Sequence, residues 1–286
     1  MTCYLNGEFK PIEEACVSVL DRGFIFGDGV YEVIPVYSRH PFRLNEHLRR
    51  LQHSLDGVRL ANPYTGEQWH DLIHRLIDAN PWPDQSVYLQ ITRGVAKRDH
   101  AFPPGIPPTV FMMTNELVPP SEALKRTGVA AVTAIDNRWV RCDLKATSLL
   151  PNVLLRQLAV DAGAVETVLL REGFLTEGAA SNIFLVRGGG VIAPPKGHLM
   201  LPGITYDVVL ELARENEIPC EIREISEFEV RTAEELWLTS STREVLPITQ
   251  LDGQPVGSGR PGPMFERMNA HYQAYKNLVM RSPKAS

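Results

Sequence analysis

One lysine of this chain lies in a context that favours amine chemistry. The sequence has only seven lysines among its 29 basic residues, and most of them lie beside Pro, Gly, Arg or the chain end. Lys145 instead lies within the moderately apolar stretch 139–152, just before an expected helix. Partial burial disfavours the charged form of an amine and makes it a better nucleophile. Lys145 is therefore a candidate for a Schiff base, the alternative being a lysine on the wet face of a strand.

A glutamate followed by small residues is the second candidate. Glu177 precedes Gly-Ala-Ala-Ser at the entry to an expected strand. Small residues let a backbone approach a flat ligand closely. A carboxylate that is partly buried there needs a positively charged partner. The alternative is a turn glutamate in water.

Two segments have the character of anion sites. Residues 200–205 open a helix, whose free N–H groups and dipole attract anions. Residues 239–244 hold a cluster of hydroxyls that suits phosphate oxygens. The alternatives are an ordinary helix N-terminus and a polar turn. The candidate ligands from the residues alone are the Thr205 hydroxyl in the first segment and the hydroxyls of Ser240, Ser241 and Thr242 in the second.

Basic side chains supply a possible clamp for carboxylates. Arg98 and His100 lie two residues apart in an expected loop, and Arg50 lies in an expected helix. An arginine offers a forked pair of donors that matches a carboxylate. Each of these residues alone would be ordinary surface charge. The other candidates supply an amine for a Schiff base, an acid for a ring nitrogen and two phosphate-binding segments. Together with these basic side chains, they make up the set of groups expected in a pyridoxal phosphate site that acts on amino acids.

The elements that must position these residues follow from hydrophobic spacing and turn residues. The first part of the chain predicts helices and strands in alternation, with Asn45 as a helix N-cap. A proline-rich loop at 103–108 separates two of its strands. We expect strands at 17–20, 30–37, 86–93 and 109–115, and helices at 46–58 and 67–79.

A second set of elements follows Val118-Pro-Pro-Ser, which is the best domain boundary. Gly188-Gly-Gly is predicted to be a hairpin turn. The chain is thus expected to be a mixed α+β protein with domains at 1–120 and 121–286. We expect further strands at 128–134, 167–171, 182–186, near 221 and at 235–238, and helices at 151–162, from 203 and at 263–280.

Composition narrows the class of protein. The chain has 286 residues, 44% hydrophobic and 22% charged, which is typical of a globular protein. A formal net charge of −5 argues against nucleic acid as the main partner. No apolar run approaches the length needed to span a membrane, and no signal peptide is visible. The four cysteines are scattered, so we expect a cytoplasmic protein without disulfides or a metal site.

Several motifs in order resemble those of the fold type IV pyridoxal phosphate enzymes. The matching segments are Asp21–Glu32, His47–Leu51, Lys145–Asn152, Thr176–Asn182 and the glycine that leads the helix at Gly203. This group includes branched-chain aminotransferases, D-amino acid aminotransferases and aminodeoxychorismate lyases. Tyr31 together with Arg98-Asp99-His100 makes the chain most similar to D-amino acid aminotransferases. The resemblance implies a small N-terminal α/β domain, a larger β-barrel-like domain with helices, and a homodimer with shared active sites.

The resemblance also implies roles for individual residues. Lys145 would hold pyridoxal 5'-phosphate covalently and move the substrate's Cα proton, and Glu177 would pair with the pyridine nitrogen. Leu201 would lie against the ring. Val33 and Tyr88 would line the substrate pocket, while Tyr31, Arg98 and His100 would bind the substrate carboxylate, the last two from a partner subunit. The phosphate would be held by Arg50, Ile204, Thr205 and a hydroxyl of Ser240, Ser241 or Thr242.

The expected activity is a ping-pong transamination between a D-amino acid and a 2-oxo acid. One departure is Ala179-Ala180, where D-specific members carry serines. Alternatives on the same fold are an aminodeoxychorismate lyase, an (R)-amine transaminase, a branched-chain aminotransferase and a non-catalytic binding protein.

Overall fold

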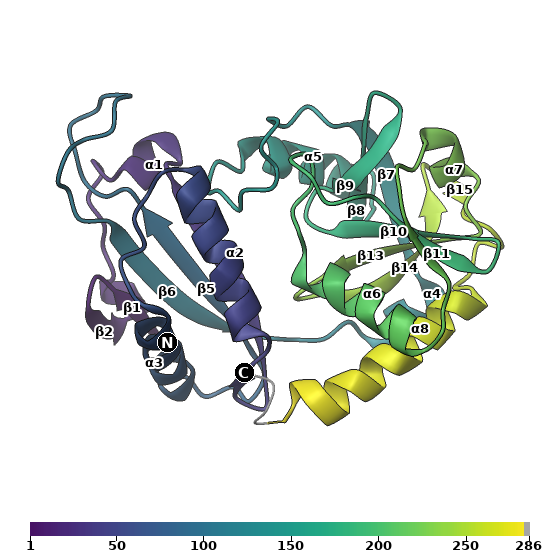
Figure 1. The fold of residues 1–286 in the computed structure, drawn as a ribbon, viewed down its shortest axis with the longest axis horizontal. Helices are drawn as coiled ribbons and strands as arrows, with labels where there is room; N and C mark the ends of the chain where they lie inside the picture. The colour runs from purple at the N-terminus through teal and green to yellow at the C-terminus, as the bar shows by residue number, and fades with distance from the viewer. Residues whose placement is uncertain (283–286) are drawn as a thin grey trace. The chain divides into compact units, whose positions relative to one another are not determined.

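The computed structural model describes residues 1–282, and the contacts within the chain divide it into two compact units (Figure 1). The first unit contains Met1–Val118, Leu144–Leu149 and residues 278–282. The second contains Pro119–Asp143 and Leu150–Asn277. Lys145 therefore folds with the first unit, although it lies beyond the expected boundary. The division into domains at residue 120 stays a prediction.

The first unit is built on a six-stranded sheet with the order β2-β1-β6-β5-β3-β4. Neighbouring strands pair antiparallel throughout. Two helices, α2 (Leu44–Gly57) and α3 (Gly66–Asp78), pack on one face of this sheet (Figure 1). A short helix, α1 (Arg22–Phe26), and the 3-10 turn Ile12–Glu14 precede β3. The strands are β1 (Thr2–Leu5), β2 (Glu8–Pro11), β3 (Gly29–Tyr37), β4 (His40–Pro41), β5 (Gln85–Thr92) and β6 (Thr109–Glu116).

Alternation along β3 decides which residues form the core and which face outward. Successive strand side chains point to opposite faces of a sheet. Val30, Ile34 and Val36 are fully buried in the same apolar cluster as Leu51 and Leu55 of α2. The odd-numbered residues of β3, from Tyr31 onward, consequently lie on the opposite face of the sheet. This register separates the helical core from the face that carries predicted substrate contacts.

Two local expectations for the first unit are wrong. Helix α2 begins after Arg43, which adopts a left-handed conformation, so Asn45 is not its N-cap but lies inside the first turn. There the side chain of Asn45 bonds to His70. Residues 17–20 form a loop and not the expected strand. The side chains of Val17, Val19 and Leu20 are exposed there, so the apolar character of this segment does not reflect burial in a sheet. The helix expected at 67–79 is present as α3, whose two ends each lie one residue earlier than expected. It begins with a Thr65–Gln68 capping box.

The second unit contains a nine-stranded mixed sheet with the order β12-β11-β10-β13-β14-β7-β8-β9, and β15 pairs with β14. Parallel pairing joins β7 to both β14 and β8, and β11 to β12. The apolar core gathers side chains from β7, β8, β10, β13 and β14. The strands are β7 (Val129–Ile135), β8 (Glu166–Arg171), β9 (Phe174–Gly178), β10 (Asn182–Arg187), β11 (Gly190–Ala193), β12 (Cys220–Ile222), β13 (Glu235–Ser240), β14 (Glu244–Leu251) and β15 (Gln254–Pro255).

Helices accompany this sheet in the described part of the second unit, and the predicted mixed α+β class is confirmed. Helices α5 and α6 lie where the sequence predicts them, and the hairpin at Gly188–Gly189 joins β10 to β11 as predicted. Strands β9 and β14 are not predicted, since neither segment shows clean alternation. The helices are α4 (Glu122–Thr127), α5 (Leu150–Asp161), α6 (Ile204–Glu215), α7 (Glu227–Arg231) and α8 (Pro263–Tyr275), the last continuing as the π-helical turn Lys276–Met280. Within residues 1–282, the helices are too short or too polar to cross a membrane.

Candidate active site

Lys145 lies against the start of β3 in the first unit. The Lys145 carbonyl accepts a hydrogen bond from the Tyr31 amide at 2.9 Å, and Ala146 bridges to Val30. The Lys145 amide donates to the Ser54 hydroxyl on α2 at 3.1 Å. Its Nζ lies 4.2 Å from the centre of the Tyr31 ring. The backbone of this lysine is thus held by two elements, while its amine rests on an aromatic face.

The predicted substrate contacts Tyr31, Val33 and Tyr88 share the face of the sheet opposite the helices. Val33 pairs directly with Tyr88 across β3 and β5, and the rings of Tyr31 and Tyr88 lie 5.7 Å apart. Tyr88 donates its hydroxyl proton to Gln90 at 2.6 Å, and burial raises its pKa to about 12. The structure therefore brings these three residues together with Lys145 on one side of the first unit.

Arg50 lies on the helical side of the same sheet, in a buried ion cluster. It donates to both carboxylate oxygens of Glu32, at 2.7 and 2.8 Å. His47 lies 2.8 Å from the same carboxylate through Nδ1, and its Nε2 is buried without a partner among the described residues. Burial raises the pKa of Glu32, but Arg50 and His47 outweigh this and bring it well below its ordinary value. Burial lowers the pKa of His47. Arg50 as a phosphate ligand stays a prediction.

Arg98 and His100 are exposed on the loop between β5 and β6, and both contact one ring. Phe26 of α1 lies 5.4 Å from the Arg98 guanidinium and 5.4 Å from the His100 ring. Tyr31 instead contacts Lys145 and Tyr88. Within one chain the pair therefore lies on the Phe26 ring, and its role in binding a substrate carboxylate stays a prediction.

Glu177 is the buried acid of the second unit. It lies on β9, is 5% exposed, and accepts a hydrogen bond from Arg138 at 2.5 Å. Its second oxygen accepts from the Leu201 amide at 3.2 Å and from the Asn182 side chain at 3.3 Å. Burial raises the pKa of Glu177 to about 7, while the Arg138 charge acts in the opposite direction. The carboxylate therefore has the positive partner that its burial requires.

Arg138 is a site residue that sequence reasoning missed. Its guanidinium also binds Asp136 with two donors at 2.9 Å, and Arg171 lies 3.2 Å from Asp136. Thr176, beside Glu177, donates to the same aspartate. The available signal was the Asp-Asn-Arg triplet that follows β7, which places two opposite charges two residues apart.

The turn before α6 lies directly beside Glu177. Asn182 donates to the Leu201 carbonyl at 3.0 Å, and a Cβ on Gly203 would lie 2.0 Å from the Asn182 side chain. Gly203 is the N-cap of α6, and no side chain among the described residues caps that helix. Ile204 and Thr205 are buried in its first turn. This N-terminus is suited to bind an anion.

The hydroxyl cluster forms the turn from β13 to β14. Thr239 is 1% exposed and pairs with Asn182 across the sheet, and its hydroxyl has no partner within residues 1–282. Ser240 and Ser241 are partly exposed and Thr242 is exposed. The Arg243 amide donates to the Ser240 hydroxyl at 3.2 Å, which fixes the turn.

These residues fit a planar, anionic cofactor. The second unit offers a buried acid beside the turn at Leu201–Gly203, a helix N-terminus without a side-chain cap in the described chain, and a buried hydroxyl at Thr239. An acid suits a ring nitrogen, whereas the N-terminus and hydroxyl suit a phosphate.

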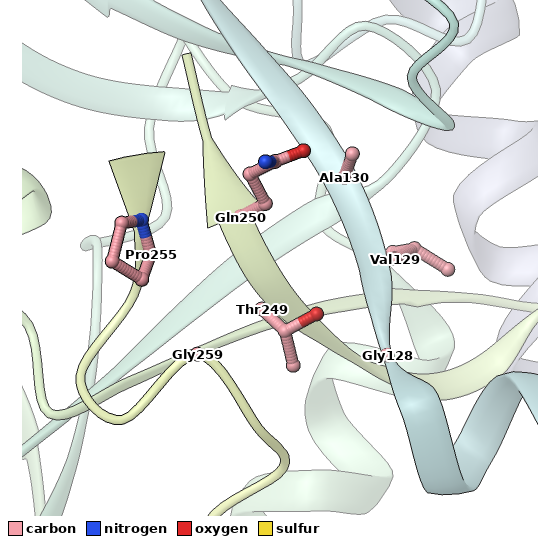
Figure 2. A pocket seen from close by; sticks show the side chains of 7 residues that line it. All are labelled: Gly128, Val129, Ala130, Thr249, Gln250, Pro255 and Gly259. Atoms are coloured by element: carbon pink, nitrogen blue, oxygen red, sulfur yellow. The ribbon is translucent and has the colours of Figure 1, made fainter. Parts of the chain in front are cut away.

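A separate hollow in the second unit does not coincide with these residues (Figure 2). It lies between β7 and β14, where the register shifts between Ile248 and Gln250. Figure 2 shows Thr249 and Gln250 beside Val129 and Ala130. The residues that line this hollow include none of the predicted site residues.

Comparisons with known proteins support the assignment of this chemistry. The sequence model described as "Amino-transferase class IV" matches residues 29–251. The chain belongs to the class IV aminotransferases. It is similar to the D-alanine aminotransferase of Bacillus licheniformis, with 38% identity over 273 residues that cover 96% of each chain. The resemblance drawn from the sequence motifs is thereby confirmed.

Solved structures of branched-chain amino acid aminotransferases share the fold. The T.th. branched-chain amino acid aminotransferase with pyridoxamine 5'-phosphate matches with a TM-score of 0.90 at 28% identity, covering 99% of this chain and 96% of that one. The branched-chain amino acid aminotransferase of Escherichia coli matches with a TM-score of 0.87 at 27% identity, covering 97% and 93%. The predicted fold type IV class is confirmed.

Proposed function

We propose that this protein is a pyridoxal 5'-phosphate-dependent transaminase that moves an amino group between a D-amino acid, such as D-alanine, and a 2-oxo acid. The observation that carries the proposal is the Arg98–His100 pair, assembled on one ring in a chain 38% identical to a D-alanine aminotransferase. A guanidinium and an imidazole on one exposed loop suit a substrate carboxylate.

Lys145 of the first unit is the proposed catalytic amine. Pyridoxal phosphate, when bound, supplies a carbonyl carbon that exchanges amines and a ring that takes up the electron pair of the broken Cα–H bond. Lys145 would hold the cofactor covalently, and its free amine would take the Cα proton of the substrate. The Tyr31 ring, 4.2 Å from Nζ, limits where this amine can move.

Glu177 of the second unit is proposed to bind the ring nitrogen of pyridoxal phosphate. A carboxylate there favours the protonated ring nitrogen, which strengthens the ring as an electron acceptor. Arg138 favours the charged form of this carboxylate and orients it, because it donates to one oxygen and leaves the other toward Leu201. Leu201 is assigned to the ring face.

The phosphate is assigned to the N-terminus of α6 and to the hydroxyl turn. Ile204 and Thr205 are proposed to supply backbone and hydroxyl donors there. Arg50 stays proposed as a further phosphate ligand. Ser240, Ser241 and Thr242 remain the candidate hydroxyls, and the buried hydroxyl of neighbouring Thr239 supports a polar ligand at this turn.

The substrate is assigned to the open face of the first unit's sheet. Val33 and Tyr88 form an apolar wall on which a small side chain would rest, and Tyr31 lies between that wall and Lys145. Arg98 and His100 are proposed to reach this face from a partner subunit, which agrees with their exposure in one chain.

A homodimer is supported by apolar side chains that one chain leaves exposed. Large exposed apolar surfaces mark association sites in soluble proteins. The loop before α1 exposes Val17, Val19 and Leu20. Helix α5 adds apolar residues that are each 48–69% exposed, namely Leu150, Val153, Leu154, Leu158 and Val160.

The compartment is proposed from the cysteines. The thiols of Cys3, Cys16, Cys142 and Cys220 are free of disulfide bonds within residues 1–282. Free thiols are typical of proteins that work in a reducing environment, where disulfides rarely persist. We therefore propose the cytoplasm.

The test is a pair of half-reactions in which purified holoenzyme is mixed with D-alanine or L-alanine while the visible absorbance of the cofactor is followed. We expect loss of that absorbance with D-alanine and release of pyruvate, restored by a second 2-oxo acid. Lys145→Ala should bind cofactor without the absorbance of the covalent form and should not turn over.

Reaction with L-alanine or L-leucine but not with D-alanine would overturn the proposal in favour of a branched-chain-type enzyme. Pyruvate release from aminodeoxychorismate without an amino acceptor would favour the lyase.

A further inference from the structure

The loop that carries Arg98 and His100 is closed at its base. It runs from the end of β5 at Thr92 to the start of β6 at Thr109. Gly94 has a φ of +99°, and a Cβ there would lie 2.1 Å from the Pro107 carbonyl. The two ends of the loop therefore approach each other closely enough to require glycine. Its middle, residues 97–102, is exposed and forms no strand or helix.

One guanidinium holds the backbone of this middle part. Arg22, the first residue of α1, donates through Nη1 to the Asp99 carbonyl at 2.5 Å and to the Ala101 carbonyl at 3.3 Å. Its Nη2 donates to the His100 carbonyl at 3.4 Å. Three successive peptide groups thus point at one side chain. Connecting loops are usually more mobile than the elements they join, so these three bonds to a buried residue restrict this loop.

Arg22 is itself held in place. It is only 3% exposed, and its Nε donates to Asp28 at 2.7 Å. Asp28 also accepts two hydrogen bonds from Arg93, at 2.8 and 3.0 Å. The Arg22 amide donates to the Gly94 carbonyl at 2.9 Å. The guanidinium is consequently fixed by contacts that do not involve the loop's middle.

Phe26 connects Arg22 to the two side chains that project from the loop. The Arg22 guanidinium lies 4.8 Å from the centre of the Phe26 ring, and Arg98 and His100 each lie 5.4 Å from the same ring. A quadrupolar ring attracts cations placed over its face. Arg22 therefore sets the loop backbone, while Phe26 sets the side chains.

We propose that Arg22 is a positioning residue for substrate binding: by holding the carbonyls of residues 99–101 it presents Arg98 and His100 in the geometry that captures a carboxylate. This inference rests on the proposed function, since it assigns Arg22 a role only through Arg98 and His100. Lysine cannot replace it, because one ammonium lacks the fork that bonds Asp28 and three carbonyls together.

The test compares Arg22→Lys holoenzyme with wild type, with D-alanine and 2-oxoglutarate as substrates. We expect KM for both substrates to rise about tenfold while kcat changes less than about twofold. This pattern follows when a substitution weakens binding of the ground state and of the transition state equally. The cofactor absorbance should be unchanged.

Arg39→Lys is the matched control, because Arg39 also bonds an aspartate and two carbonyls of the first unit but lies away from the loop. The KM of this control variant should stay at the wild-type value. Should Arg22→Lys fail to fold, Asp28→Asn, which weakens the anchor of Arg22, should raise KM in the same direction.

A double-mutant cycle separates positioning from general loosening. In an Arg98→Ala/His100→Ala background, Arg22→Lys should add less than about a twofold change in KM, because the groups that it positions are gone. An equal tenfold effect in both backgrounds, or an unchanged KM in the single variant, would overturn the role of Arg22 while leaving the proposed function intact. Wild-type enzyme without D-alanine turnover would overturn both.

Discussion

The Nη1 atom of Arg138 lies 2.5 Å from Oε1 of Glu177, and both side chains are buried. The same guanidinium binds Asp136 with two further donors. One arginine therefore compensates two carboxylates that have little access to water. This pairing makes the acid of the second unit dependent on a residue 39 positions earlier in the chain.

Arg138→Met should destabilise the protein strongly. Removing one partner of a buried ion pair leaves an uncompensated charge, which costs about 3–5 kcal/mol of unfolding free energy. Urea denaturation at pH 8 measures this loss. Arg141→Met is the control, because the Arg141 side chain is 43% exposed and its pair with Asp143 contributes about 0–1 kcal/mol. Equal effects of the two substitutions would contradict the role of burial.

His47 should make the protein sensitive to mild acid. Burial lowers the pKa of His47 below its ordinary value of 6.5, so below pH 6.5 the unfolded chain takes up a proton that the folded chain resists. Stability should therefore fall as pH drops from 7 to 5, by at most about 1.4 kcal/mol per pH unit for this group. His47→Gln should flatten the pH dependence of the urea midpoint. The exposed His53, changed to Gln, should leave the slope as in wild type.

Gly203→Ala should weaken cofactor binding. An added Cβ would collide with the Asn182 side chain, which holds the Leu201 carbonyl and the Glu177 carboxylate. We expect the dissociation constant for pyridoxal phosphate to rise about tenfold, which corresponds to about 1.4 kcal/mol. Equilibrium titration of the apoenzyme measures it. Gly197→Ala is the control, because nothing among the described residues lies within 4 Å of its Cβ position; a similar loss there would refute the steric explanation.

Leu154→Glu should weaken the proposed dimer. Leu154 is 60% exposed on α5, and a charge buried in an apolar interface has no partner. Sedimentation equilibrium should show a shift toward monomer at low micromolar concentrations. Val118→Glu introduces the same charge at a valine that is 71% exposed outside α5, and it should leave association unchanged. A monomeric wild type would remove the basis of the prediction.

Much of this protein was determined by local sequence. The alternation at 30–37 and the helical spacing at 67–79 were sufficient for β3 and α3, because the period of apolar residues decides which face is buried. The same alternation put Tyr31 and Val33 on one face and Glu32 on the other. The order of motifs around Lys145, Glu177 and Gly203 identified the enzyme class, which the comparisons confirmed.

Only the tertiary structure decided which charges are paired. Arg138 with Glu177, Arg22 with three loop carbonyls and Arg50 with Glu32 are each joined across 18 to 79 residues of sequence. Local propensity carries no information about such pairs, because an arginine's sequence neighbours do not reveal which distant carboxylate or carbonyl lies beside it after folding. Burial then imposes the pairing, since a charge removed from water must find a partner within hydrogen-bonding distance.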